Sequence, residues 1–410
     1  MTDDSRLAQL AFRSNSFSRL LAANTVSSLG NNLAAVALSL DVWDRTHRSS
    51  WVALVLAGNL GGAFVVGALL SPLLDRWHRK WLMVGSDVVS AAAFLLLLVV
   101  RAPIGIVGVA ALVGLMSAVF RPSTRAVVPR LVADRDLAAA NGLLTSCEAW
   151  ANALGALAGG AAVAFSGPLL AYLVNAVSFL ASATLVGSAR IDRGVVSQRV
   201  AGHWRQLGEG FRFVYRQRTL RMLLVSWNLA AFGFAVANVA EVALIRHTLH
   251  GSALGFGVAS ASAALGAMVG SIGAARLVRR SSPNEVLAGA LAVMAFAALA
   301  TALAPTVIAV CPALFGLGLA NGVGLVCMFT LMQRAAPEEL RGRVLSALFS
   351  TISLTMMVST LLGGALCDWL GARTVWAAAA GLILGGAGSS RALREHGESS
   401  PAPALAAEGS

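Results

Sequence analysis

The chain has 410 residues, of which 57% are hydrophobic and 12% are charged. A soluble domain of this length could not hydrate so apolar a surface, so the composition excludes a water-soluble globular protein and predicts a membrane protein. The net charge of +12 does not indicate nucleic-acid binding, because the arginines fall between long apolar runs. The four cysteines lie inside apolar runs without a CxxC pair or a neighbouring histidine, so we expect neither a disulfide nor a metal site.

Twelve apolar segments approach or exceed the ~20 residues that a helix needs to cross a bilayer. They cover roughly 17–40, 50–71, 81–100, 103–120, 138–165, 169–189, 219–245, 252–275, 284–304, 306–332, 344–369 and 374–390. The last segment is short and contains three glycines. This pattern predicts an all-α membrane protein with twelve transmembrane helices.

The basic residues predict how the chain is oriented. The turn at 71–80 reads S-P-L-L-D-R-W-H-R-K between two apolar segments, and basic turns stay on the cytoplasmic side. With both termini in the cytoplasm, 26 of the 31 Lys and Arg residues fall on that side. We therefore expect a multi-pass protein of the cell membrane, plasma or inner, with both termini cytoplasmic.

The segments divide into two halves of six. We expect an N-terminal bundle over 1–189, a cytoplasmic linker over 190–218, a C-terminal bundle over 219–390 and a disordered tail over 391–410. The linker contains HWRQLGEGFRFVYRQ, which has apolar residues at helical spacing among arginines. This pattern predicts an amphipathic helix on the membrane surface, with a partner-binding helix as the alternative.

Matching landmarks indicate that the halves are repeats. A shift of 204 residues places Gly159-Gly160-Ala161 on Gly363-Gly364-Ala365, in the fifth segment of each half. Each of these segments follows a basic turn that contains proline. Repeated bundles are typical of secondary transporters, whose substrate site lies between the halves near the bilayer midplane.

On these motifs the chain resembles the major facilitator superfamily from about residue 17 to 390. The family's loop between helices two and three has the pattern G-x-L-A-D-R-x-G-R-K/R, and this chain keeps Leu73, Asp75, Arg76, Arg79 and Lys80 but departs from it with Ser71, Leu74 and His78. The runs FRPSTRAVVPRLVADRDLAAANGL, LAYLVNAVSFLASATL and APEELRGRVLS resemble the multidrug, macrolide and siderophore exporters, the branch of the enterobactin exporter.

The resemblance implies a gate at the loop. The carboxylate of Asp75 would pair with the start of helix eleven, near Arg343 and Val344, and close the cytoplasmic side. The expected gating residues are Asp75, Arg76, Arg79, Lys80 and Arg343. The alternative is a solvated basic turn that only sets the topology.

Glycines mark the fifth segment of each half. The antiporters of the family carry a glycine-rich signature there, and this chain has Gly142, Gly155, Gly159 and Gly160 in register. It departs from the signature at Ala151 and at Ala156, the latter in place of a proline. We expect these glycines, with Gly363 and Gly364, to let helices pack closely; generic packing and an exporter-specific hinge remain open.

The chain needs an energy source and shows no ATP site of its own. A P-loop requires lysine followed by Ser or Thr, whereas Lys80, the only lysine, precedes Trp81. The resemblance implies proton coupling, which needs a carboxylate within the membrane. The candidates are Glu148, Asp87 and Glu241. We favour Glu148, because it lies deepest in a helix expected to border the cavity.

Each of these carboxylates has a structural alternative. Glu148 and Asp87 can instead be satisfied by neighbouring helices, and Glu241 can reach the interface or pair with Arg246. Relatives show an acid in helix one where this chain has Asn31, which forms hydrogen bonds but carries no proton.

Polar and aromatic residues in the segments are the candidates for the substrate cavity, with helix packing as the alternative for each. They are Asn24, Asn31, Asn32, Asn59, Trp150, Trp227, Asn228 and Asn238.

The function that the sequence predicts is proton-driven export of a hydrophobic or amphipathic small molecule. The alternatives are a metabolite importer or facilitator and a non-transporting assembly or secretion factor. We expect no enzyme activity, since no HExxH, GxSxG or metal cluster appears. The expected partners are a small-molecule substrate and the lipid bilayer, with no nucleic acid, cofactor or metal, and a monomeric protein.

Overall fold

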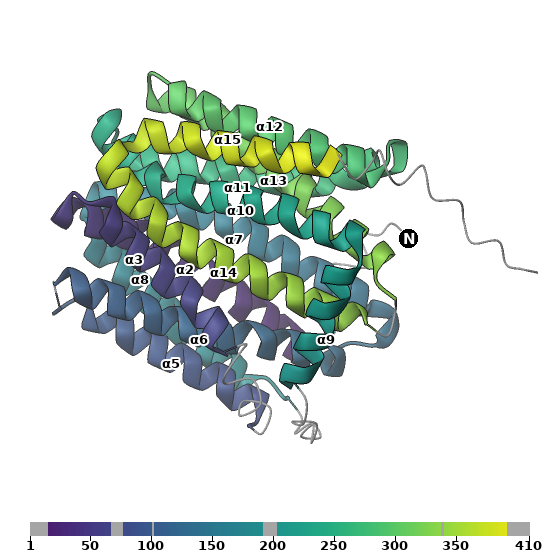
Figure 1. Cartoon of the computed structure of the whole chain (residues 1–410). Helices are drawn as coiled ribbons and strands as arrows, with labels where there is room; N and C mark the ends of the chain where they lie inside the picture. Colours follow the sequence, from purple (N-terminus) through teal and green to yellow (C-terminus); the bar gives the residue numbers. More distant parts are fainter. Residues whose placement is uncertain (1–14, 67–76, 101, 192–202, 338–339, 392–410) are drawn as a thin grey trace, which may run out of the picture.

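The computed structural model describes residues 15–66, 77–100, 102–191, 203–337 and 340–391. Within these residues the chain is helical, with twelve long helices and a shorter one in the linker (Figure 1). The long helices are α2 (Asn15–Thr46), α3 (Ser49–Val65), α5 (Arg79–Leu96), α6 (Pro103–Leu131), α7 (Leu137–Ser166), α8 (Pro168–Ser188), α10 (Arg218–Ala243), α11 (Ala253–Arg280), α12 (Pro283–Leu303), α13 (Val307–Ala335), α14 (Arg341–Leu370) and α15 (Ala372–Arg391), and α9 (His203–Arg216) is the linker helix. The twelve long helices occupy the twelve predicted segments, but some bounds differ. In particular, α6 continues to Leu131, beyond its predicted end at residue 120, so the stretch RPSTRAVVPRL, predicted as part of a basic turn, is helical.

Local sequence signals end one helix and begin the next. Gly167 takes a φ of +75° between α7 and α8, and Gly371 takes +82° between α14 and α15. Residues with a side chain rarely adopt this conformation, so glycine allows each sharp turn. The hydroxyl of Ser252 accepts a hydrogen bond from the backbone N–H of Gly255 at 3.0 Å, which caps the start of α11. Short capped turns of this kind let long helices run antiparallel.

The outer surface is apolar. Large side chains such as Phe165, Trp369, Ile308 and Val99 are at least 80% exposed. A soluble protein could not expose so many of them, whereas lipid chains solvate them well. Eight of the described helices are also long and apolar enough to cross a membrane. The fold is therefore an all-α membrane protein, as the sequence predicts.

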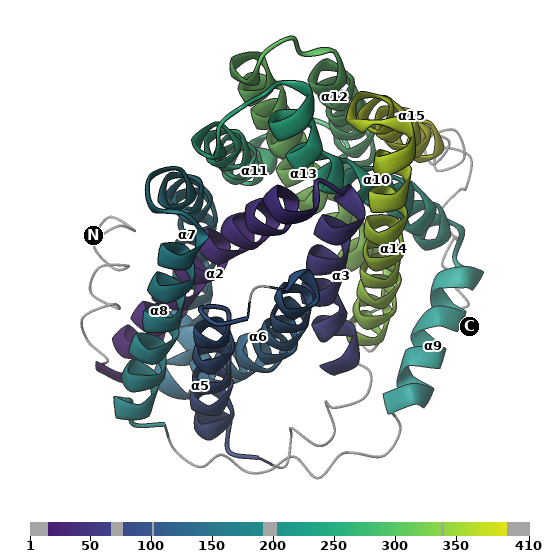
Figure 2. The same cartoon turned by 90° about the vertical axis from the view of Figure 1, so that its left-hand side faces the viewer.

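The helices form two bundles of six, seen end-on in Figure 2. Helices α2 to α8 make one half and α10 to α15 make the other. The halves meet mainly at two helix pairs, α7 with α11 and α3 with α14, and α10 makes smaller contacts with α2 and α3. The linker helix α9 packs mainly on α14, and its Gly210 lies against the backbone of Arg343.

The paired glycines show that the halves are related by pseudo-symmetry. A Cβ on Gly159 would meet α2, and a Cβ on Gly363 would meet α10, the first helix of the same half in each case. A Cβ on Gly160 would meet Gly257 of α11, and one on Gly364 would meet Ser50 of α3. The second glycine of each pair therefore contacts the second helix of the opposite half.

The other predicted packing glycines have different outcomes. Gly155 packs closely, since a Cβ there would lie 2.7 Å from the Leu29 carbonyl oxygen of α2. The packing prediction for Gly142 is wrong, because a Cβ at this position would have no neighbour within 4 Å. Gly142 lies near the start of α7.

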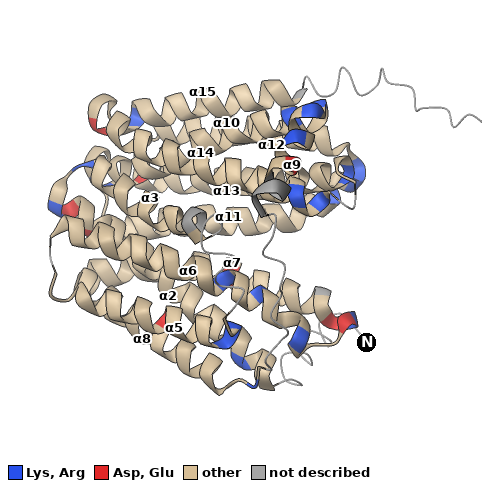
Figure 3. Cartoon of the chain, turned by 60° about the horizontal axis from the view of Figure 1, so that its bottom comes forward, with Lys and Arg blue, Asp and Glu red and all other residues tan. Residues whose placement is uncertain are grey.

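Basic residues are more numerous at one end of the molecule than at the other (Figure 3). This arginine-rich end contains the start of α5 and α14 and the end of α6 and α11, with Arg79, Arg130, Arg280 and Arg341. We call the other end, where α2 meets α3 and α14 meets α15, the opposite end. The predicted tail after Arg391 lies outside the described residues.

Candidate functional site

A charged cluster joins α2, α6 and α7 in the first half. A guanidinium nitrogen of Arg125 lies 3.1 Å from Oε2 of Glu148, and Nδ2 of Asn24 donates to Oε1 at 3.1 Å. The side chains of Arg125 and Glu148 are 42% and 30% exposed, so the ion pair is open to water or a ligand. Both oxygens of Glu148 are engaged, and binding a proton there would weaken the ion pair.

A polar stripe on α7 extends this cluster. Asn141, Thr145, Glu148 and Asn152 recur at spacings of four, three and four residues, which places them on one face of a helix. The guanidinium of Arg125 also reaches Thr145 Oγ1 at 3.4 Å. At the far end of the stripe, the amide of Asn32 donates to Oδ1 of Asn152 at 2.6 Å. The stripe thus faces α2 and α6 with hydrogen-bonding groups along several turns.

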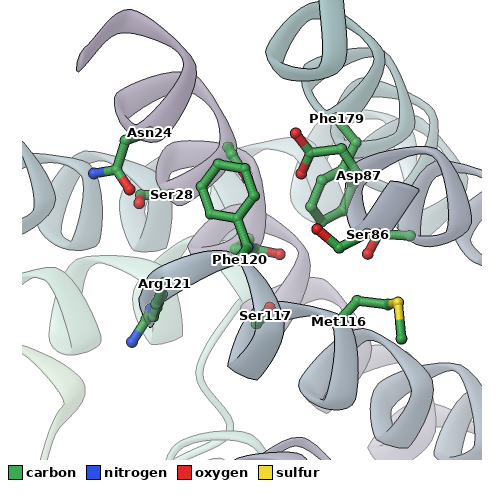
Figure 4. Close-up of a pocket in the computed structure, with 12 residues that line it drawn as sticks. Asn24, Ser28, Ser86, Asp87, Met116, Ser117, Phe120, Arg121 and Phe179 are labelled. Atoms are coloured by element: carbon green, nitrogen blue, oxygen red, sulfur yellow. The ribbon is translucent and has the colours of Figure 1, made fainter. Parts of the chain in front are cut away.

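A polar pocket lies around Asp87 inside the bundle of the first half (Figure 4). Side chains from α2, α5 and α6 line it, among them Asn24, Asn31, Ser86 and Ser117. Asp87 is 1% exposed, and its Oδ2 has no hydrogen-bond partner among the described residues. Asn24 lines this pocket and also donates to Glu148, so the pocket lies beside the charged cluster.

Glu241 is buried in the second half. It is 6% exposed, and its Oε1 accepts a hydrogen bond from the Ser260 hydroxyl of α11 at 2.8 Å. Pairing with Arg246, which the sequence left open, does not occur. Arg246 instead pairs with Asp44 at 2.8 Å, because it lies beyond Glu241 in a π-helical turn at the end of α10.

A cavity of about 180 Å³ lies between the halves. Leu38, Val55 and Leu56 line it from the first half, and Phe234 and Met356 line it from the second. Three polar side chains join this apolar lining, namely Asn59, Asn238 and Thr360. An apolar cavity with a few polar groups suits a ligand that is itself largely apolar.

The remaining cavity candidates have separate positions. Trp227 is 7% exposed and packs against Gly324, so it belongs to the core of the second bundle. Asn228 accepts a hydrogen bond from Thr355 at 2.6 Å and joins α10 to α14. Trp150 is 50% exposed and does not line the cavity between the halves.

The expected gate is described only in part. Asp75 and Arg76 lie outside the described residues, so their expected contacts with helix eleven stay a prediction. Lys80 Nζ donates to the carbonyl oxygen of Ala189 at 2.9 Å, within its own half. Arg343 forms an ion pair with Glu209 of the linker helix. Arg79 starts α5 at the arginine-rich end.

Three residues that the sequence did not indicate as candidates make notable contacts in the structure. Arg125 was counted only as a basic residue, although it pairs with Glu148. Asn152 could have been found from the polar spacing on α7. Asp368 was not among the candidate carboxylates, yet it accepts hydrogen bonds from the other half. No sequence signal within one segment could have shown that contact.

The described residues show no candidate metal site and no disulfide bond. No group of three or more His, Cys, Asp and Glu side chains lies together in a way that could hold a metal ion. The cysteines that the structure describes are free thiols.

Comparisons with known proteins agree with this architecture. Residues 6–405 match the family MFS_3, described as "Transmembrane secretion effector". Among similar proteins, "Uncharacterized MFS-type transporter y4rN" of Sinorhizobium fredii is 27% identical over 82% of this chain and 86% of its own length. "Macrolide efflux protein A" of Streptococcus pyogenes is 23% identical over 87% of this chain and 90% of its own.

Solved structures show the same fold at low identity. A bacterial homologue of the iron transporter ferroportin, in an inward-facing state, has a TM-score of 0.75 and 17% identity over 92% of this chain and 98% of its own. The nucleoside transporter NupG has a TM-score of 0.73 and 12% identity, covering 92% of this chain and 99% of its own.

Proposed function

Because the chain belongs to the MFS_3 family of major facilitator transporters, we propose that it exports a hydrophobic or amphipathic small molecule in exchange for protons. The observation that carries this proposal is the cavity between the halves. Its lining is mostly apolar, and Asn59, Asn238 and Thr360 offer a few hydrogen-bonding groups. Such a cavity suits a drug, antibiotic or siderophore better than a phosphorylated or highly charged metabolite, which needs a cluster of charges.

The proposed direction of transport follows from the two ends of the molecule. We place the arginine-rich end in the cytoplasm, in line with the distribution of basic residues. The hydrogen bonds of Asp368 and the ion pair of Asp44, which join the halves, lie at the opposite end. The conformer therefore fits a transporter that receives its substrate from the cytoplasm.

Proton coupling is assigned to Glu148. Its carboxylate is held by Arg125 and Asn24, and a proton on it would remove the charge that attracts Arg125. An arginine released in this way can change its contacts along the polar stripe of α7, which links protonation to helix position. Asp87 and Glu241 are more deeply buried carboxylates and are the next candidates.

The test is accumulation in cells that lack their main exporters. A panel of macrolides, cationic dyes and siderophores is measured with this chain or with Glu148→Gln, with and without a protonophore. We expect lower accumulation of at least one compound, and we expect the protonophore and the substitution each to abolish the difference. Increased accumulation would indicate import, and an unchanged panel would contradict export of this substrate class. Asp87→Asn and Glu241→Gln, assayed in parallel, decide between the carboxylates.

A further inference from the structure

Two polar contacts hold the halves together at the opposite end. The carboxylate of Asp368, near the end of α14, accepts hydrogen bonds from the backbone N–H of Ser49 at 2.5 Å and of Ser50 at 3.0 Å. Asp44 at the end of α2 pairs with Arg246 after α10 at 2.8 Å. Each contact joins one half to the other. We propose that Asp368, Asp44 and Arg246 form the gate that closes this end during transport, an inference that rests on the proposed function.

The contact of Asp368 is a helix cap supplied by the opposite half. Ser49 and Ser50 begin α3, and the first N–H groups of a helix have no partner inside it. A carboxylate there satisfies these donors and interacts favourably with the helix dipole. The carboxylate of Asp368 therefore caps α3 only while the halves are together at this end.

The glycine pair explains how Asp368 reaches the backbone of α3. Gly364 and Asp368 are four residues apart and share one face of α14. A Cβ on Gly364 would lie 2.9 Å from the Cα of Ser50, so the absence of a side chain lets the two helices touch. One turn later, the carboxylate of Asp368 meets the exposed amides.

The other interface between the halves lacks this device. In α7, four residues after Gly160, the position of Asp368 is taken by Ala164. The N-terminus of α11 is capped by its own Ser252, which accepts from Gly255 at 3.0 Å. The carboxylate cap is thus not required by the repeat itself. The cap occurs at one of the two main interfaces, where contact between the halves depends on the negative charge of Asp368.

The second contact is suited to repeated breaking. The side chains of Asp44 and Arg246 are 42% and 26% exposed, so water can replace each partner when the halves separate. Arg246 also donates to the carbonyl oxygen of Gly251 at 3.1 Å, which holds it in the turn before α11. The gate therefore consists of two contacts that water can reach on one side of a tightly packed glycine interface.

Native cysteines provide the test. Cys367 precedes Asp368 and is 4% exposed, and Cys147 lies in α7 towards the arginine-rich end, beside Glu148. Full-length proteins that retain one of these two cysteines, with the other three cysteines of the chain replaced by serine, are treated with a membrane-impermeant maleimide, in intact cells and in inside-out vesicles. We expect Asp368→Ala to speed labelling of Cys367 by about threefold or more, as expected when a helix loses its N-terminal cap. Labelling of Cys147 should slow, because opening one end closes the other.

Matched variants separate a gate from local loosening. Asp41→Asn removes a carboxylate at the same end, but its partners Arg45 and Tyr172 lie in the same half, so both rates should stay unchanged. Each single change, Asp44→Arg or Arg246→Asp, should speed labelling of Cys367, and the two changes together should give slower labelling than either alone.

The outcomes distinguish the gate from the proposed function. Unchanged labelling of Cys367 in Asp368→Ala, or faster labelling of both cysteines, would overturn the gate. Faster labelling of Cys367 that appears only in inside-out vesicles would keep the gate and overturn the orientation. If the labelling rates change as expected but the protein exports no compound of the panel, the gate stands and only the proposed substrate class is refuted.

Discussion

Replacing Glu148 with glutamine separates proton coupling from structure at the charged cluster. Glutamine has nearly the same shape, and its carbonyl oxygen can still accept the hydrogen bond from Asn24. The change removes the negative charge that pairs with Arg125 at 3.1 Å and the group that binds a proton. The two consequences have very different expected sizes.

The cost in stability is small. The two side chains are 30% and 42% exposed, and ion pairs open to solvent contribute about 0.2–1 kcal/mol. A loss of about 1 kcal/mol changes a folding equilibrium about fivefold, which leaves most molecules folded. An amide does not titrate in the accessible pH range, so we expect the protonophore-sensitive part of transport to disappear entirely.

The assay uses purified protein in proteoliposomes with an imposed pH gradient and a compound that the cell panel identifies. Thermal unfolding of the same preparations reports stability. Asp136→Asn is the matched control, because it removes a carboxylate from an exposed ion pair with Arg135 at 3.8 Å at the arginine-rich end. The reasoning is refuted if Glu148→Gln transports in response to the gradient as well as the control does.

Three further predictions concern the same machinery. Gly160→Val should slow transport severely, because even a Cβ at this position would lie 2.7 Å from Gly257 and would keep the halves apart. The control Gly142→Val should be tolerated, and transport of both variants is measured at equal protein level. Combining Arg125→Gln with Glu148→Gln should lower the unfolding temperature by less than the sum of the two single changes, because the ion pair is lost only once; a fully additive drop in the melting curve would contradict the pairing. Asp75→Asn should reduce transport without changing protein level, and unaltered transport would remove its gating role.

The glycine predictions show how far a repeat can be interpreted from sequence. The alignment of Gly159-Gly160 with Gly363-Gly364 placed both pairs in equivalent helices, and the structure shows equivalent neighbours. The periodic signal could not show that the first glycine packs within its half and the second packs across. Gly142 fitted the family pattern but has no close neighbour, because a pattern along one helix carries no record of how far away the next helix lies.

The charged site was predictable only one residue at a time. Glu148 was singled out because a carboxylate inside a membrane segment is costly, which is a property of its own surroundings in sequence. Its partners Arg125 and Asn24 lie 23 and 124 residues away. Asp368 and Ser49, which are 319 residues apart, form the contact that sequence reasoning had passed over.

The sequence by itself determined the number and order of the long helices, and it predicts the side of the membrane on which most arginines lie. These features depend on local hydrophobicity, on glycine and proline at turns and on charge between apolar runs, all of which act over a few residues. Only the tertiary structure decided which carboxylate meets which donor. The pairing of a carboxylate with its donor depends on the register and tilt of helices from both halves. Small residues such as Gly364 set this register, because they allow two helices to touch at their own position.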